Sequence, residues 1–288
     1  MFPVGGFGTR FLPATKALPK EMLPVVDKPI IHYAFEEARA AGIEQFIFVT
    51  GRNKSTIDNH FDHSYELQSH LSREGKQRQL DLTESWLPPP GSVMFTRQRQ
   101  MLGLGHAIWC ARHMVGDEPF AVILVDDMVL SKTPCLKQMT QAYLPGINML
   151  GVTEVPRAQT SSYGIVDIDR RTAIKNKSMV KARGLVEKPK PEKAPSTLSI
   201  IGRYILQPEI FEVLERQKPG TNGEIQLTDA IAALIGTQDV YGFQYEGTRY
   251  DCGAQEGYVT ANVAYALQRK DIGAGVRAAL NHLLKQVG

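Results

Sequence analysis

Residues 5–24 read GGFGTRFLPATKALPKEMLP and follow directly on a short apolar run. The glycines carry no Cβ atom, so their backbone N–H groups can approach a phosphate closely. Three prolines between residues 13 and 24 exclude a regular helix and leave a long, stiff loop. That loop carries Arg10, Lys16 and Lys20 past the glycine turn. The pattern suits a polyphosphate ligand, although a tight turn followed by a solvated basic loop also explains it.

Strand and helix patterns alternate outward from this loop as far as residue 150. Buried strands are expected at 45–50, 93–97 and 120–125, and helices between Pro29 and Gly42 and over 105–114. Strands that alternate with helices predict an α/β fold. We expect a Rossmann-like mixed, mostly parallel central sheet with helices on both faces, joined by right-handed crossovers.

The pattern changes after residue 150, where turns or loops join the expected strands. Strands are expected at 149–155, 164–169, 184–187 and 198–206, and helices at 208–216, 228–235, 257–269 and 272–286. The last two helices are amphipathic and form a C-terminal helical tail. Its apolar face would pack on its own domain or serve as a subunit interface.

Composition excludes several classes of protein. The 288 residues are 43% hydrophobic, which excludes intrinsic disorder, and a formal charge of +3 gives no sign of a nucleic-acid groove. The longest apolar runs are about six residues, against the roughly 20 that a membrane-spanning helix needs. Nothing at the N-terminus resembles a signal peptide. The cysteines at 110, 135 and 252 have no metal-binding spacing and indicate reduced thiols. We expect a cytoplasmic enzyme without nucleic-acid or membrane partners.

The motif G-x-G-T-R followed by P-K-E-M-L-P resembles the sugar-1-phosphate nucleotidyltransferases. The longer stretch GTRFLPATKALPKEMLPVVDKP is similar to the bacterial UTP–glucose-1-phosphate uridylyltransferases within that family. The resemblance covers essentially the whole chain. It continues with RQ and GLGHA within 97–107, GDEPFAVILVDD at 116–127, YGIV at 163–166, GLVEKP at 184–189, IIGRYIL at 200–206, GEIQLTDAI at 223–231 and YDCG at 250–253.

The resemblance implies an activity and an organisation. The activity is Mg²⁺-dependent transfer of UMP from UTP to glucose 1-phosphate, giving UDP-glucose and pyrophosphate by direct in-line displacement. The fold is that of a nucleotidyltransferase, similar to glycosyltransferase A folds. It implies one domain with a nucleotide-binding part (1–150), a small β-rich sugar-phosphate-binding part (151–255) and C-terminal helices (256–288). Family members commonly form homodimers or homotetramers.

The resemblance also assigns roles to residues. The loop residues Gly5, Gly6, Gly8, Thr9 and Arg10 would hold the UTP phosphates, and Lys20 would help to position them. Gln98 and the backbone near Gly103 would read the uracil edge, where a side-chain amide offers a donor and an acceptor.

The sugar phosphate and the metal take the remaining roles. Gly164 would let the sugar ring approach the backbone, Glu187 would accept hydrogen bonds from hydroxyls, and Lys188 would grip the phosphoryl group. Asp126 would bind Mg²⁺, because it follows a buried strand and carboxylate oxygens suit that cation. Asp251 is a second acidic candidate across the site. Arg10, Lys20 and Lys188 are the expected catalytic cations.

Two features depart from the family pattern. Relatives usually carry several residues before the first strand, so a short first strand is expected here. Valine at position 125 stands where proline commonly precedes the metal-binding aspartate, a change that a buried strand tolerates. The pair His60 and His63 has no further ligands at zinc spacing and is expected on a polar helix surface.

Rival functions stay open within the family. Transfer from dTTP is one, because uracil and thymine differ only by a methyl group. A non-catalytic regulatory paralogue is another, although Arg10, Lys20, Asp126 and Lys188 argue against it. A nicotinamide-dependent dehydrogenase is excluded because no acidic residue ends the strand QFIFVTGR.

Overall fold

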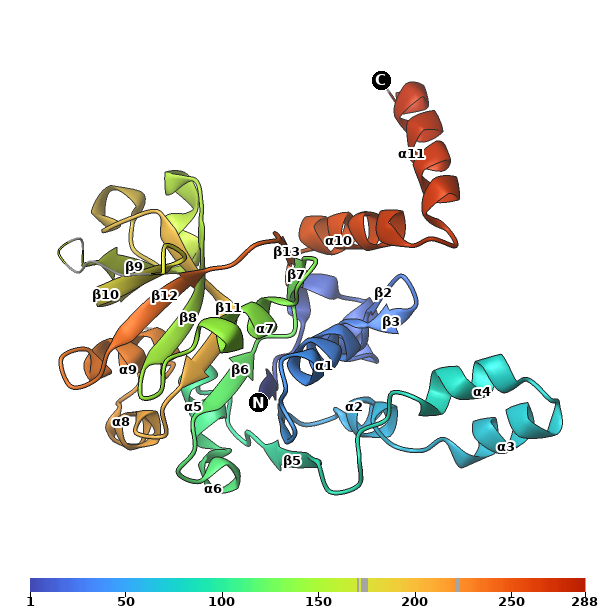
Figure 1. Ribbon diagram of the computed structural model, residues 1–288, viewed down its shortest axis with the longest axis horizontal. Helices are drawn as coiled ribbons and strands as arrows, with labels where there is room; N and C mark the ends of the chain where they lie inside the picture. The colour runs from blue at the N-terminus through green and yellow to red at the C-terminus, as the bar shows by residue number, and fades with distance from the viewer. Residues whose placement is uncertain (170, 172–175, 221–222, 288) are drawn as a thin grey trace.

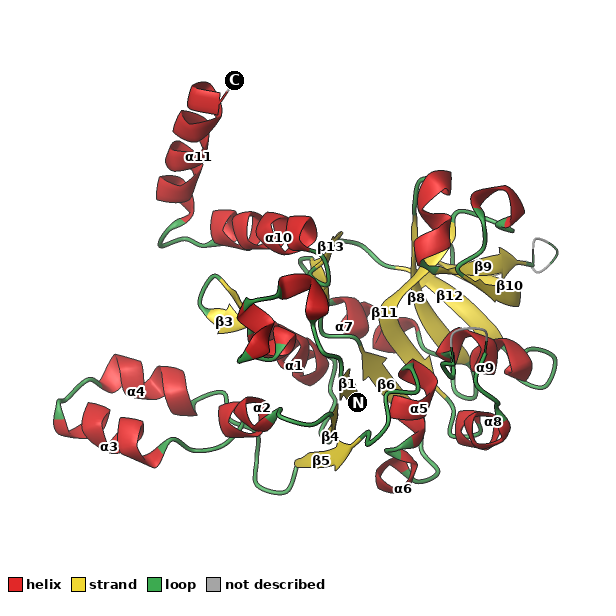
Figure 2. Ribbon diagram, turned by 180° about the vertical axis from the view of Figure 1, so that it is seen from behind, coloured by secondary structure: helices red, strands yellow, loops and turns green. Residues whose placement is uncertain are grey.

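The computed structural model describes residues 1–169, 171, 176–220 and 223–287 (Figure 1). Its body is a mixed α/β fold with strands at the centre and helices around them, as predicted. Two helical pairs project from this body, one in the first third of the chain and one at the C-terminus (Figure 2). In the described part of the chain, no helix is long and apolar enough to cross a membrane.

The strands and helices have the following bounds. The strands are β1 (Phe2–Val4), β2 (Pro24–Val25), β3 (Lys28–Pro29), β4 (Phe46–Thr50), β5 (Val93–Arg97), β6 (Phe120–Ile123), β7 (Asp127–Leu130), β8 (Asn148–Glu154), β9 (Gly164–Ile168), β10 (Met179–Glu187), β11 (Leu198–Leu206), β12 (Val240–Gln244) and β13 (Thr248–Asp251). The α-helices are α1 (Ile30–Ala40), α2 (Ser55–His60), α3 (Tyr65–Arg73), α4 (Gln77–Glu84), α5 (Leu104–Trp109), α6 (Arg112–Val115), α7 (Cys135–Ala142), α8 (Ile210–Arg216), α9 (Leu227–Leu234), α10 (Gln255–Gln268) and α11 (Gly273–Val287). The short 3-10 helices are η1 (Thr9–Phe11), η2 (Ala14–Lys16), η3 (Lys20–Met22), η4 (Arg157–Ser162) and η5 (Pro191–Lys193).

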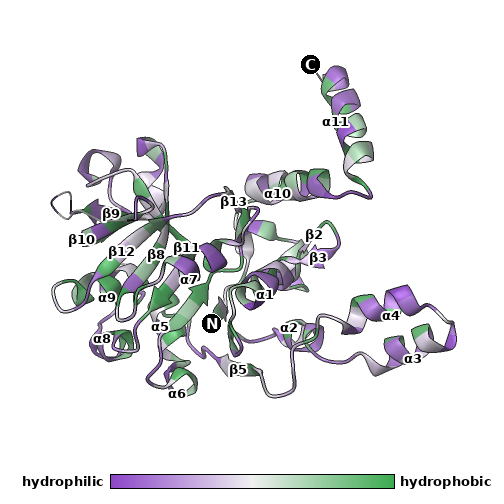
Figure 3. Ribbon diagram, viewed as in Figure 1, coloured by the Kyte–Doolittle hydropathy of each residue, from purple (hydrophilic) through white to green (hydrophobic). Residues whose placement is uncertain are grey.

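Strands β1, β4 and β5 form a parallel sheet in the order β1-β4-β5. Every residue of β4 is buried, as expected for a parallel strand covered on both faces. Its alternate residues enter two cores: Phe46 and Phe48 pack with α1 and α7, whereas Ile47 and Val49 pack with α5, α8 and α9. The sheet is therefore covered by helices on both sides. In Figure 3 hydrophobic stretches, drawn in green, are visible along β6 and α5.

The second sheet departs from the mostly parallel arrangement that we predicted. It has the order β6-β11-β8-β12-β10-β9, and only the β8–β12 pair is parallel. Short connections such as the one between β9 and β10 favour antiparallel neighbours, whereas parallel pairs need long crossovers. Hydrogen bonds of Met1 with Ala121 and Ile123 join β6 to β1 and so connect the two sheets.

Two predicted elements are interrupted. The strand expected at 120–125 ends at Ile123, because the N–H of Leu124 bonds to Gly202 and the chain then turns, with the N–H of Asp127 donating to Leu124. The helix expected at 105–114 is divided into α5 and α6. Asp126 consequently lies in the turn between β6 and β7, and Asp127 is the first residue of β7. The strands predicted at 93–97 and 198–206 are present with those bounds, and the other predicted strands and helices are present with shifted ends.

The division into parts at 1–150, 151–255 and 256–288 stays a prediction. Strand β6 comes from the first part, yet it pairs with β11 of the second. The C-terminal helices are present as α10 and α11. Figure 1 shows α11 pointing away from the body, with α10 between them.

Candidate functional site

The glycine-rich loop follows β1 at the carboxyl edge of the parallel sheet. Gly8 has a backbone φ of +67°, and a Cβ atom there would lie only 3.0 Å from the Cβ of Lys20. Glycine is therefore required by both conformation and space. The hydroxyl of Thr15 donates to the Gly8 carbonyl at 2.7 Å. Thr9 and Arg10 follow as exposed residues of η1.

A buried ion pair between Lys54 and Glu21 contacts this loop. Lys54 donates to the carboxylate of Glu21 at 2.6 Å and to the Gly6 carbonyl at 2.8 Å. Burial raises the pKa of Glu21 against the opposing pull of Lys54. Our sequence analysis gave neither residue a role. The only available signal was the position of Glu21 beside Lys20 in the motif P-K-E-M-L-P.

Lys20 and Asp126 meet across the site. The Lys20 ammonium donates to the Asp126 carboxylate, with 2.5 Å between Nζ and Oδ2. Burial disfavours both charges, but the attraction of Lys20 outweighs it and lowers the pKa of Asp126. The attraction of Asp126 likewise raises the pKa of Lys20, although desolvation of the ammonium opposes this. Both groups are therefore ionised at neutral pH.

Asp251 lies close to the same point. A Cβ atom placed on Gly253 would be 3.0 Å from Oδ1 of Asp251, 3.1 Å from Oδ2 of Asp126 and 3.7 Å from NH1 of Arg10. Pairing of β13 with β7 sets Asp251 opposite Asp127 and explains this approach. The carboxylates of Asp126 and Asp251 and the guanidinium of Arg10 thus surround the backbone of Gly253, which has no side chain. The paired carboxylates could hold a hard divalent cation.

The predicted sugar-phosphate residues lie in a cleft of about 320 Å³ that Asp126 and Asp251 also line. A Cβ atom on Gly164 would be 3.2 Å from Oε2 of Glu187 and 2.9 Å from the Thr228 hydroxyl oxygen, so the backbone is open here only because the residue is glycine. Lys188 has a φ of +45°, an uncommon conformation for a lysine. Its ammonium lies 3.0 Å from Oε1 of Glu187.

Gln98 is buried where β5 ends beside β4 and the glycine-rich loop. Its backbone N–H donates to Thr50 at 2.9 Å, and its side-chain Nε2 donates to the Gly103 carbonyl at 2.9 Å. Gly103 has a φ of +92°, and a Cβ atom there would be 2.8 Å from that of Glu224. The two residues predicted to read the base are therefore in direct contact.

Arg249 and Asp127 also belong to the site, although the sequence gave them no role. Arg249 donates from Nε to Asp127 at 2.5 Å and from NH1 to the Tyr163 hydroxyl at 3.1 Å. The backbone N–H of Lys188 donates to the Tyr163 carbonyl. This chain of contacts connects the segment that carries Asp126 with the segment that carries Lys188. Burial raises the pKa of Asp127 despite the charge of Arg249.

The expectation of a polar helix surface is wrong for His60, and His63 is exposed but lies in the loop after α2 and not on a helix. His60 is half-buried, with Nε2 3.1 Å from Nδ1 of His32 and its ring stacked on Trp86. The rings of His32, in α1, and Trp86, after α4, cover it. Its burial was not visible in the local pattern, because Trp86 is distant in sequence.

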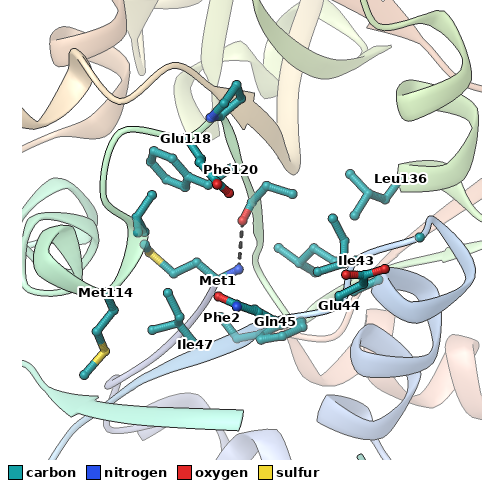
Figure 4. A pocket seen from close by; sticks show the side chains of 16 residues that line it. Met1, Phe2, Ile43, Glu44, Gln45, Ile47, Met114, Glu118, Phe120 and Leu136 are labelled. Carbon is teal, nitrogen blue, oxygen red and sulfur yellow. Dashed lines mark hydrogen bonds between the residues drawn. The ribbon is translucent and has the colours of Figure 1, made fainter. Parts of the chain in front are cut away.

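A second cavity of about 430 Å³ lies away from the predicted site, around Met1 (Figure 4). Its lining includes Phe2, Ile43, Gln45 and Ile47, and none of the predicted site residues. The Met1 ammonium donates to Ala121 at 2.8 Å, and burial lowers its pKa to about 5. The cleft between Asp126 and Lys188 holds the residues predicted to bind the metal and the sugar phosphate, so it is the candidate site.

Comparison with known proteins agrees with this geometry. The nucleotidyl transferase family model matches residues 4–268. The chain is 47% identical to a UTP–glucose-1-phosphate uridylyltransferase of Bacillus subtilis (strain 168), over 94% of this chain and 92% of that protein. A UDP-glucose pyrophosphorylase from Acinetobacter baumanii has a TM-score of 0.89 at 40% identity, with 98% of each chain covered. A UDP-glucose pyrophosphorylase complexed with UDP-glucose has a TM-score of 0.80 at 44% identity, over 93% of this chain and 98% of that one. The chain therefore belongs to the nucleotidyl transferase family and, within it, to the UTP–glucose-1-phosphate uridylyltransferases.

Proposed function

We propose that the chain transfers UMP from UTP to glucose 1-phosphate, giving UDP-glucose and pyrophosphate. The observation that carries this proposal is the single cleft in which Asp126 and Asp251 lie together with Gly164, Glu187 and Lys188. Lys20 lies beside Gly8 and bonds to Asp126, so it joins the glycine-rich loop to the cleft, and Gln98 lies beside Gly5 of that loop. The relatives' names, and the UDP-glucose complex among the similar structures, support the same reaction.

The UTP phosphates are proposed to bind along the loop from Gly5 to Arg10. Gly5, Gly6 and Gly8 leave room for close approach, and the exposed residues Thr9 and Arg10 lie at the end of the loop, where the Arg10 guanidinium donates to the Gly253 carbonyl at 3.4 Å. Lys20 would provide charge at the α-phosphoryl group and the departing pyrophosphate. Fixed cations stabilise the negative charge that grows there in the transition state.

Glucose 1-phosphate is proposed to bind in the cleft at Gly164, Glu187 and Lys188. The Glu187 carboxylate would accept hydrogen bonds from two sugar hydroxyls above the bare backbone of Gly164. The Lys188 ammonium is half exposed and only 3.0 Å from Glu187, so it can turn toward a phosphoryl group beside the sugar. Holding both reactants in one cleft supplies much of the rate through orientation.

Asp126 and Asp251 are the proposed ligands of Mg²⁺. Their donor set fits that cation, which takes one or two carboxylates and completes its coordination with phosphate oxygens and water. In the described part of the chain, no cluster of three or more acidic, histidine or cysteine side chains could hold a metal alone. When bound, Mg²⁺ would neutralise phosphoryl oxygens that otherwise repel the attacking oxygen.

The reaction is a direct displacement at the α-phosphorus of UTP. A phosphate oxygen of glucose 1-phosphate forms the new P–O bond while the bond from the α-phosphorus to the bridging oxygen breaks. Pyrophosphate takes the electron pair of the broken bond and leaves on the side opposite the attacking oxygen. Lys188 holds the attacking phosphate, and Arg10 and Lys20 hold the leaving group. Because the nucleophile is already an anion, no residue has to remove a proton.

The test is pyrophosphate release from each nucleoside triphosphate with glucose 1-phosphate, with and without Mg²⁺. We expect Mg²⁺-dependent release with UTP as the preferred substrate, and UDP-glucose as the product. Equal or better use of dTTP would contradict the assignment of the base. Release from none of the triphosphates would contradict the proposed activity and favour a regulatory paralogue.

A further inference from the structure

Gln98 has a fixed amide orientation in this structure. Its Nε2 atom lies 2.9 Å from the Gly103 carbonyl oxygen, which can only accept a hydrogen bond, so the amide nitrogen and not the oxygen must face Gly103. Nε2 is also 3.2 Å from Nδ1 of His106. Both amide protons therefore have partners within the protein.

The contacts of His106 define its tautomer. Nδ1 faces an N–H donor and must carry the lone pair, so the ring proton is on Nε2, which lies 3.9 Å from the Cys110 sulfur. Burial lowers the pKa of His106, against a smaller opposing effect of the Gln100 backbone. A neutral ring can accept at Nδ1, whereas an imidazolium cannot.

The amide oxygen of Gln98 is left for a ligand. Among the described residues it has no hydrogen-bond partner, and it is not one of the fully enclosed polar atoms. It lies 3.1 Å from the position that a Cβ atom on Gly5 would take, at the start of the proposed phosphate loop. The side chain thus presents an acceptor, and no free donor, to whatever binds beside that loop.

We infer that His106 is a specificity-determining positioning residue, which holds the Gln98 amide so that its oxygen selects a pyrimidine with an N3–H group. The inference rests on the proposed function and on the predicted contact of Gln98 with the base of the nucleotide. Uracil carries a proton on N3 and donates to this oxygen. Cytosine has a lone pair on N3, which the same oxygen repels, so the fixed amide acts against CTP as well as for UTP.

The position of His106 relative to Gln98 explains why the local sequence alone could not reveal this. His106 is the third residue of α5, and its ring contacts Gln98, the residue that follows β5. Without His106, one proton of Nε2 loses its acceptor. The amide is then held by Gly103 alone, and the freed proton is available to the N3 lone pair of cytosine.

The experiment measures dissociation constants for UTP and CTP by calorimetry, in Mg²⁺ and without glucose 1-phosphate. His106→Leu removes the acceptor at similar volume, and His106→Asn replaces Nδ1 with the amide oxygen at the equivalent position. The exposed His113, on the neighbouring helix α6, supplies the matched control His113→Leu. Thermal unfolding of each variant checks that it is folded.

We expect His106→Leu to reduce the ratio of UTP to CTP affinity by about tenfold, the order expected for one hydrogen bond. His106→Asn should keep most of the wild-type ratio, and His113→Leu all of it. An unchanged ratio in His106→Leu, an equal loss for both nucleotides, or an Asn variant as impaired as the Leu variant would overturn the inference. Because no sugar phosphate is present, these results are separate from any failure of the proposed reaction.

Discussion

Lys188 has an uncommon backbone conformation, and its half-exposed ammonium pairs with Glu187. We predict that Lys188→Ala raises KM for glucose 1-phosphate and lowers kcat/KM by about 10²–10³, because one fixed cation is lost from the transition state. Affinity for UTP should stay unchanged. Lys190→Ala is the matched control, since this exposed lysine lies two residues away. Steady-state kinetics in both substrates would decide, and near-wild-type kcat/KM for Lys188→Ala would exclude the assignment.

Asp126 is kept ionised by Lys20, so its charge is available for a cation at neutral pH. We predict that Asp126→Asn weakens binding of Mn²⁺, used as a probe of the Mg²⁺ site, and lowers turnover at saturating substrate. The exposed Asp117 provides the control Asp117→Asn. Electron paramagnetic resonance of free Mn²⁺ measures the affinity. Unaltered Mn²⁺ binding in Asp126→Asn would remove Asp126 from the metal site.

His60 gives a pH dependence of stability that is independent of activity. Burial, and the neighbouring His32, lower its pKa from 6.5 to about 4 in the folded protein. Between these values the unfolded chain binds more protons than the folded one, so the free energy of unfolding falls as pH falls from 6.5 toward 4. Urea unfolding across this window should show a smaller slope for His60→Phe. His63→Phe should keep the wild-type slope, and equal slopes in all three proteins would contradict the account.

At the scale of elements, strands β7 and β13 pair beside the cleft, and Arg249 of β13 donates to Asp127 of β7. The side chains of Asp127 and Arg249 are only 10% and 16% exposed. We predict that Arg249→Met lowers the free energy of unfolding by about 3–5 kcal/mol, because it leaves a buried carboxylate without its partner. KM for glucose 1-phosphate should rise as Tyr163 loses its contact. Chemical denaturation and kinetics measure the two effects.

The double variant Arg249→Met with Asp127→Asn provides the control for that prediction. Removing both charges should recover part of the lost stability, because the uncompensated carboxylate is gone. It should not restore KM, since the contact to Tyr163 is still missing. Additive losses in the double variant would show that the pair is not coupled and would contradict this description of the cleft.

Sequence patterns predicted the elements whose signals are local. The glycine-rich loop, the buried strand β4 and the helix α1 each follow from residues within one segment. The contacts of Arg249 with Asp127 and Tyr163 join residues far apart in sequence, and strand register decides them. The antiparallel pairing in the second sheet also depends on contacts between segments far apart in sequence, so local patterns did not predict it. The candidate site residues lie within recognisable motifs, and so do Asp127 and Tyr163, but their partner Arg249 lies outside every motif and is found only from its contacts.

At the scale of the whole molecule, α10 and α11 carry apolar side chains into solvent. Leu283 and Leu284 of α11 are 53% and 71% exposed. We predict that the protein is a homo-oligomer in which this helix contacts another subunit, because burying such side chains stabilises an association. Leu283→Ser with Leu284→Ser should reduce the mass measured by light scattering. Leu82→Ser, on the projecting helix α4, is the control. A monomeric wild-type protein would contradict the prediction.

The account's central claim is that one cleft aligns both reactants, so that transfer occurs in a single displacement. The direct measurement is the stereochemical outcome at the α-phosphorus, with UTP that carries sulfur at one diastereotopic α-oxygen and ³¹P NMR of the sugar-nucleotide product. A single in-line displacement predicts inversion of configuration. Retention would require two displacements through a covalent intermediate on the protein, and it would contradict the claim.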